Sequence, residues 1–140
     1  MRCLIFLILS LPQFAFAQNI TINGKDSVYN LKSAKVVIRG NQLIASTGNI
    51  ERRWKWTGNG WQTISLKDLQ VNREYAVIQE KMQCDWSLPG AISDSSRAEF
   101  IDLQVEENND EGFSNKHLQV ISTIKYPNAH LLVRYTVWVF

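Results

Sequence analysis

Apolar and polar residues alternate in short segments along most of this chain, and no other feature restricts its fold as strongly. Successive side chains of a β-strand point to opposite faces of the sheet, so alternation predicts strands that bury one face. The alternating segments are separated by short runs rich in Gly, Asn, Asp, Ser and Pro, which favour turns. No segment combines a helix cap with three turns of helical periodicity. The sequence therefore predicts an all-β protein, an antiparallel β-sandwich.

A tryptophan-rich hairpin is expected where the segment 50–56 is followed by a Gly-Asn-Gly turn and a returning strand. Trp54 and Trp56 share one face of the first strand. The register of the second strand stays open, because one step of register moves every side chain to the other face. A two-residue loop places Trp61 beside the first two tryptophans and gives an aromatic cluster. A three-residue loop places Ile64 there and gives a more aliphatic core.

Other strands are expected on the same grounds. In one of them, Ile101, Leu103 and Val105 should share a face. The last strand is apolar on both faces and should therefore be covered on both sides, so we expect the sandwich to be incomplete at the C-terminus. The full set of further strands is at residues 36–38, 43–44, 75–78, 100–106, 117–126 and 130–140, with residues 81–98 mostly in a loop.

The first 17 residues have the pattern of a cleavable export signal. One positive charge, Arg2, precedes a short apolar run, and the small-x-small triplet 15–17 follows it. The apolar run is shorter than the roughly 20 residues that span a bilayer. We expect cleavage after Ala17, a secreted or periplasmic location without membrane attachment, and one domain over residues 18–140. The alternative is that this segment is a buried N-terminal strand.

Charge and cysteine content limit the partners of the mature chain. The formal net charge is +2 and falls by one when Arg2 is removed, which leaves no electrostatic footprint for nucleic acid or an anionic membrane. Cys84 is then the one remaining cysteine, so an internal disulfide is excluded. We expect Cys84 to be a small buried hydrophobic residue; the alternative is a half-exposed thiol.

Trp54, Trp56 and Trp61 are the candidate carbohydrate-binding residues, because aromatic rings next to basic residues can stack on sugars. Arg52, Arg53 and Lys55 are interleaved with them. Alternation, however, places the tryptophans on the face opposite Arg53 and Lys55, which is also the pattern of an ordinary amphipathic strand. Packing of the three tryptophans in the core is therefore the competing interpretation.

No catalytic residue, metal site or cofactor is expected from the sequence. The acidic segment 106–112 lacks the alternating oxygen ligands of a calcium loop and is expected to be a hairpin tip. Glycoside hydrolysis needs two paired carboxylates, and no spacing in the chain pairs any. The histidines lack the tighter ligand set of a zinc site. The residues considered for these roles are Asp85, Glu99, Asp102, His117 and His130.

Most of the mature chain resembles the N-terminal, mutarotase-like β-sandwich domain of secreted bacterial glycoside hydrolases of the α-galactosidase type. In that family a strand rich in tryptophan leads through a turn into a segment that ends in Glu-Tyr, and a later apolar strand continues into a further turn. The segments that carry the resemblance are 41–44 (NQLI), 50–56 (IERRWKW), 58–63 (GNGWQT), 65–75 (SLKDLQVNREY) and 134–140 (RYTVWVF).

The resemblance implies a non-catalytic module that supports a C-terminal catalytic (β/α)₈ barrel in carbohydrate breakdown. The family's catalytic carboxylates lie on that barrel, which is missing from this chain, so none is carried over. If the sandwich contributes to a sugar surface, Trp54, Trp56 and Trp61 are the residues expected to stack on it. The alternative is a stand-alone secreted β-sandwich that binds carbohydrate or another protein. Whether the chain has an activity of its own is left open.

Overall fold

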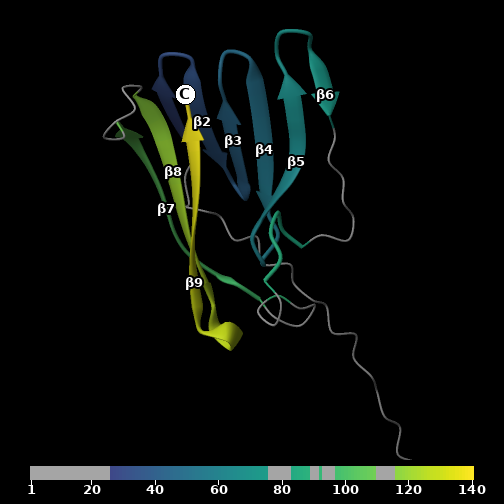
Figure 1. Ribbon diagram of the computed structural model, residues 1–140, viewed down its shortest axis with the longest axis vertical. Coiled ribbons are helices and arrows are strands. Elements are labelled where there is room, and N and C mark those ends of the chain that lie inside the picture. Colours follow the sequence, from purple (N-terminus) through teal and green to yellow (C-terminus); the bar gives the residue numbers. More distant parts are fainter. Residues whose placement is uncertain (1–25, 76–82, 89–91, 93–96, 110–115) are drawn as a thin grey trace, which may run out of the picture.

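Two antiparallel β-sheets make up the fold, which confirms the all-β sandwich (Figure 1). The computed structural model describes residues 26–75, 83–88, 92, 97–109 and 116–140. One sheet has six strands in the order β1-β2-β3-β4-β5-β6, and the other has three in the order β7-β8-β9. The expected export signal lies outside the described residues. Among those residues, no helix has the length and apolar character needed to cross a membrane.

Within each sheet, every strand pairs with its neighbours along the chain, as is usual for antiparallel sheets. The expected strand at 75–78 overlaps β6 at Tyr75 alone, and its residues beyond Tyr75 lie outside the described part. A short 3₁₀-helix, η1 (Pro127–Ala129), joins the last two strands. The strands are β1 (Ser27–Leu31), β2 (Ala34–Arg39), β3 (Gln42–Ser46), β4 (Ile50–Trp56), β5 (Trp61–Asp68), β6 (Arg73–Tyr75), β7 (Glu99–Asn108), β8 (His117–Tyr126) and β9 (Leu131–Val139).

The β4–β5 hairpin adopts the aromatic alternative. Trp56 pairs with Trp61 across a four-residue loop, so both side chains lie on the inner face of the six-stranded sheet. A loop of two residues and a loop of four both leave Trp61 on the same face as Trp54 and Trp56, because both numbers are even. The observed hairpin therefore agrees with the expectation for a two-residue loop. Ile64 falls at a register irregularity and is only partly buried. The more aliphatic core is therefore not formed.

Strand β7 departs from simple alternation. Phe100 pairs with Ile124 and Asp102 pairs with Thr123, so Ile101 is an extra residue in the ladder. Such a bulge shifts the alternation by one residue. Ile101 is consequently 53% exposed, whereas Phe100 and Leu103 face the core. The expectation that Ile101 shares a face with Leu103 is therefore wrong.

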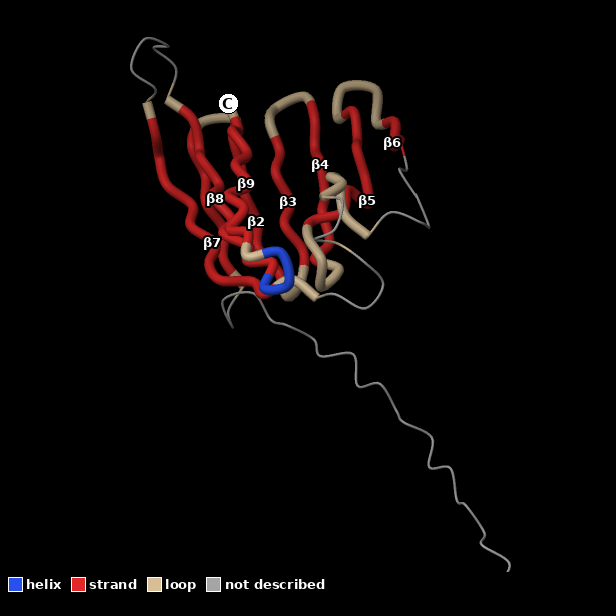
Figure 2. Tube along the Cα trace, turned by 60° about the horizontal axis from the view of Figure 1, so that its bottom comes forward, coloured by secondary structure: helices blue, strands red, loops and turns tan. Residues whose placement is uncertain are grey.

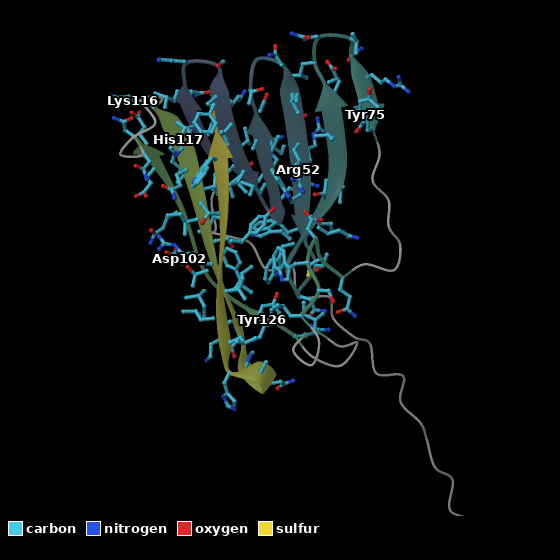
Figure 3. All side chains as sticks on the ribbon, viewed as in Figure 1. Arg52, Tyr75, Asp102, Lys116, His117 and Tyr126 are labelled. Atoms are coloured by element: carbon cyan, nitrogen blue, oxygen red, sulfur yellow. The ribbon has the colours of Figure 1, made fainter. Side chains whose placement is uncertain are left out.

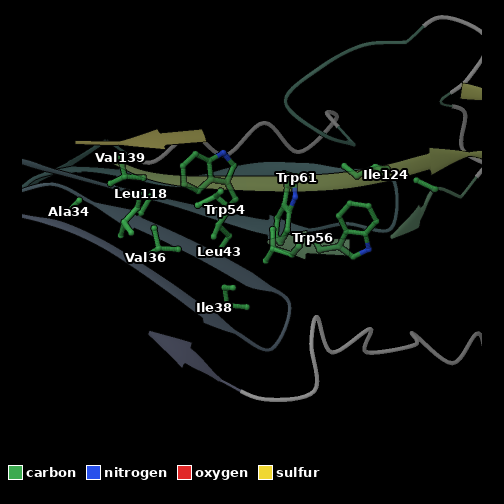
Figure 4. Close-up of a cluster of buried hydrophobic side chains, with 14 of the residues drawn as sticks. Ala34, Val36, Ile38, Leu43, Trp54, Trp56, Trp61, Leu118, Ile124 and Val139 are labelled. Carbon is green, nitrogen blue, oxygen red and sulfur yellow. The ribbon is translucent and has the colours of Figure 1, made fainter. Parts of the chain in front are cut away.

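The core lies between the two sheets, where the apolar inner faces meet (Figure 4). Its aromatic end is formed by Trp56, Trp61 and Phe100, whose rings meet edge to face at centroid distances of 5.2–6.1 Å. The Trp61 indole N–H donates a 2.9 Å hydrogen bond to Ser122 Oγ on β8. That bond joins the two sheets within the core, 61 residues apart in sequence.

The two sheets are unequal in width. Strand β8 contacts β1 and β2, and β9 contacts β2, so the smaller sheet lies over one side of the larger one. Figures 1 and 2 show β5 and β6 extending beyond β9 on the other side. The outer face of β9 is open: Leu132, Trp138 and Phe140 are 67%, 56% and 51% exposed. The expected coverage of both faces of this strand is not met within the described residues.

Candidate functional site

Trp54, Trp56 and Trp61 lie in the core rather than on a surface. Their exposed fractions are 2%, 4% and 0%. Their inward orientation follows from the register, which places all three on the face covered by the three-stranded sheet. A sugar needs an accessible ring face to stack on. The burial therefore favours the core-packing interpretation of these three residues.

A polar cluster lies on β4 and β5 of the six-stranded sheet, next to the buried tryptophans. Asp85 Oδ2 accepts a 2.9 Å hydrogen bond from Arg52 Nη2 and a 2.5 Å bond from Thr63 Oγ1. Asp85 Oδ1 accepts a 2.7 Å bond from the Thr63 backbone N–H. The Asp85 N–H in turn donates a hydrogen bond to the Trp61 carbonyl, so the 83–88 segment lies alongside the beginning of β5. We call Arg52, Thr63 and Asp85 the polar cluster.

Aromatic rings enclose the polar cluster. The Arg52 guanidinium lies 4.6 Å above the ring of Trp54, a cation–π contact. Tyr135 from β9 lies nearby: burial raises the pKa of its phenol, the Arg52 charge lowers it, and the Asp85 charge raises it. Trp86 packs against Tyr135 at a centroid distance of 5.0 Å. The arrangement holds the 83–88 segment between the two sheets.

Asp85 is therefore expected to stabilise the fold, and its replacement by alanine tests this. Asp85→Ala leaves the N–H of Thr63, a residue that is only 8% exposed, without its acceptor, and it removes the partner of Arg52. We expect the free energy of unfolding to fall by about 1–3 kcal/mol, measured by urea denaturation. Asp102→Ala is the matched control, since among the described residues Asp102 accepts a hydrogen bond from Gln104 alone, two residues away on the same strand. An equal loss in both variants would contradict the role assigned to Asp85.

A second junction joins the β4–β5 loop to β8. The Tyr126 hydroxyl donates to the Asn59 carbonyl at 2.6 Å and accepts from the Trp86 indole N–H at 3.0 Å. Gly60 lies against the same tryptophan: a Cβ at this position would come within 2.6 Å of Trp86 Cζ2. A residue without a side chain is needed there for the loop and the 83–88 segment to approach each other.

Cys84 is buried, as expected, with 2% exposure. Its thiol donates to the Trp86 carbonyl at 3.1 Å. Burial raises the pKa of the Cys84 thiol, which keeps it protonated and unreactive at neutral pH. Cys84 is thus a packing residue of the 83–88 segment.

The outer face of the three-stranded sheet carries two exposed aromatic side chains, Trp138 and Phe140. His117 packs against Phe140 and Trp138 at centroid distances of 4.8 and 5.9 Å. Gln119 lies directly opposite Trp138 in the β8–β9 ladder and so shares its face. We call His117, Trp138 and Phe140 the outer patch; Leu132 lies toward the other end of β9, beyond Arg134 and Thr136 on the same face. Figure 3 labels His117 at one end of this sheet and Tyr126 toward the other.

The carboxylates and histidines considered from sequence are dispersed. Glu99 pairs with Lys125 at 3.3 Å on the surface, whereas Asp85 belongs to the polar cluster. His117 is fully buried in the outer patch, and His130 follows the 3₁₀-helix with a left-handed backbone. Across the part of the chain that the structure describes, no three His, Cys, Asp or Glu residues are grouped to hold a metal ion. Part of the acidic segment 106–112 lies outside that part.

Sequence reasoning missed both sites that the structure reveals. Arg52 and Asp85 are 33 residues apart, and no local pattern links them. The outer patch had a visible signal, since Trp138 and Phe140 lie on one face of the last expected strand. Comparisons with protein-family models, with curated proteins and with solved structures find no match to this chain.

Proposed function

We propose that this chain is the non-catalytic β-sandwich module of a secreted glycoside hydrolase of the α-galactosidase type. In this proposal the module packs through its outer patch against the catalytic barrel and supports that barrel in carbohydrate breakdown. The outer patch is the observation that carries the proposal. Isolated surface apolar residues are common, but Trp138 and Phe140 both pack on His117 and form an exposed aromatic pair, and grouped exposed apolar residues mark interaction surfaces.

Two further features support this reading. The resemblance of the sequence covers β3, β4, β5 and the end of β9, the strand that presents most of the outer patch. Trp138 and Phe140 are more than half exposed, so a partner would remove substantial apolar area from water. Burying a large apolar side chain contributes about 1.5–3 kcal/mol, and aromatic residues are the ones most often found at binding hot spots.

The reading frame beyond Phe140 gives the first test. Under the proposal, it continues into alternating strand and helix patterns that carry two carboxylates. Residues 18–140, expressed apart from that barrel, should hydrolyse no aryl-galactoside and should bind the separately expressed barrel. A stop codon directly after Phe140, or turnover that is lost on changing one carboxylate of this chain, would overturn the proposal.

Binding should depend on the outer patch. Trp138→Ala is expected to weaken the affinity of the module for the barrel at least tenfold, measured by calorimetry. Val28→Ala is the control, since Val28 has the same 56% exposure as Trp138 but lies on the six-stranded sheet. A similar loss of affinity in both variants would exclude the outer patch as the interface.

Carbohydrate binding is the second candidate, favoured by the polar neighbours of the outer patch. Gln119 faces Trp138, and Glu106 faces Gln119 on the next strand, so hydrogen-bonding groups line an exposed aromatic ring. Under this candidate, soluble glycans change the tryptophan fluorescence of the wild-type chain and leave that of Trp138→Ala unchanged. An equal response of both proteins would exclude Trp138 as the stacking residue.

A further inference from the structure

The loop between β4 and β5 contains an Asn-Gly pair, Asn59-Gly60, which contacts the 83–88 segment and Tyr126. We call these contacts the loop junction. An asparagine followed by glycine is prone to deamidation, because glycine has no side chain to hinder attack by its own backbone nitrogen. The Gly60 nitrogen attacks Cγ of Asn59, a succinimide ring closes, and the side-chain nitrogen leaves as ammonia. Water then opens the ring at either carbonyl and gives aspartate or isoaspartate.

The packing of Gly60 requires that this labile pair be present. A Cβ at position 60 would come within 2.6 Å of Trp86 Cζ2 and within 2.8 Å of Cys84 Cβ. A residue with a side chain would therefore displace the 83–88 segment from the loop. The close approach of loop and segment thus depends on the same glycine that makes Asn59 reactive.

Hydrogen bonds in the loop junction hold the reacting groups of Asn59. Its side-chain nitrogen donates a 2.6 Å bond to Gln83 Oε1. Its backbone carbonyl accepts the 2.6 Å bond from the Tyr126 hydroxyl, and its backbone N–H donates to Thr57 Oγ1 at 3.3 Å. Ring closure needs rotation of the side chain and of the peptide that joins Asn59 to Gly60, so these bonds must open first. The rate of deamidation should therefore follow the population of the opened junction.

The isoaspartate product does not fit the closed loop junction. In isoaspartate the main chain runs through Cβ and Cγ of residue 59, which adds one carbon to the path toward Gly60. The former backbone carbonyl, which accepts the Tyr126 bond, becomes part of a free carboxylate. The added carbon moves Gly60, and Trp86 and Cys84 already approach Gly60 too closely for a Cβ. The junction therefore cannot close again once isoaspartate has formed.

We propose that Asn59 is a self-modification site, which converts a transient release of the 83–88 segment into a permanent one. The closed junction protects Asn59, and isoaspartate formed after opening keeps the segment released. The segment is bonded to both sheets, through Asp85 to β5 and through Trp86 to β8. Its permanent release would therefore loosen the attachment of one sheet to the other. The modification needs only water as co-reactant and is independent of the proposed function.

Peptide mapping by mass spectrometry, during incubation at mildly alkaline pH, tests the protection. In the folded wild type, Asn59 should deamidate at least about tenfold more slowly than in the chain unfolded by urea. Tyr126→Phe removes a bond that holds Asn59 and should speed the reaction in the folded chain about fivefold, with no change of the rate in urea. Equal rates in the folded and unfolded wild type, or no reaction at Asn59 in urea, would overturn the proposal.

Tyr29→Phe is the matched control. Tyr29 is a partly buried tyrosine of β1 that packs on the core, and it is not among the residues bonded to Asn59. This variant should leave the Asn59 rate within about twofold of the wild-type rate. Equal acceleration by Tyr29→Phe and Tyr126→Phe would mean that overall stability, rather than opening of the loop junction, sets the rate, and would also overturn the proposal.

Hydrogen exchange of the separated isoaspartate form tests the permanent release. The Asp85 amide, which donates to the Trp61 carbonyl, reports whether the 83–88 segment is docked. In the isoaspartate form this amide should exchange at least about tenfold faster than in the unmodified protein, whereas the amides of the β2–β3 ladder should not change. Unchanged protection of the Asp85 amide would overturn the proposal. Loss of protection throughout both sheets would also overturn it, because the modification would then unfold the whole module rather than release one segment.

Discussion

Replacing Trp61 by alanine is expected to lower the free energy of unfolding by about 3–5 kcal/mol. Trp61 is fully buried, and its ring meets those of Trp56 and Phe100 edge to face. The variant leaves a cavity between the sheets and also leaves Ser122, itself 1% exposed, without the indole donor. Urea denaturation followed by circular dichroism measures the loss, which should appear as a lower midpoint with little change in slope.

Trp138→Ala provides the control for this prediction. It removes the same side chain from the outer face of β9, where the ring is 56% exposed. Its cost should be smaller, about 1–2 kcal/mol, because the ring is already more than half exposed and the loss is limited to its contact with His117. Comparable losses in the two variants would mean that Trp61 does not hold the sheets together.

High pH is expected to destabilise the protein through Tyr126. Burial raises the pKa of its phenol to about 12, and proximity to Cys84 adds to this, while the hydrogen bond from Trp86 acts the other way. The folded state therefore holds this proton more tightly than the unfolded state, in which the pKa is about 10. The stabilisation is complete below pH 10 and is lost as the pH rises to 12, by about 2–3 kcal/mol.

Tyr126→Phe isolates the contribution of Tyr126 from that of the other groups that titrate at high pH. The variant is expected to be somewhat less stable at neutral pH, because it loses the bonds to Asn59 and Trp86. Between pH 9 and 12, however, the wild type should lose about 2–3 kcal/mol more than the variant. Parallel pH profiles of unfolding would show that Tyr126 does not retain its proton in the folded state.

The strand pattern was predictable because alternation is a local property. The Gly40-Asn41 turn between β2 and β3 and the inward residues of β8 follow from it directly. Ile101 was misplaced because a bulge depends on how two strands fit together, and no residue type marks it in this sequence. The face on which Trp61 lies depends on whether the β4–β5 loop has an even or an odd number of residues. The local pattern did not predict that number either.

The sequence by itself determined the fold class and most strand faces of this protein, since these depend on neighbouring residues and on a period of two. The tertiary structure alone decided which surfaces remain open. It buried Trp54 and Trp61, left Trp138 exposed, and brought Asp85 to Arg52. The physical reason is that burial depends on which sheet covers a face. That coverage is set by contacts between segments far apart in the chain, which alternation does not encode.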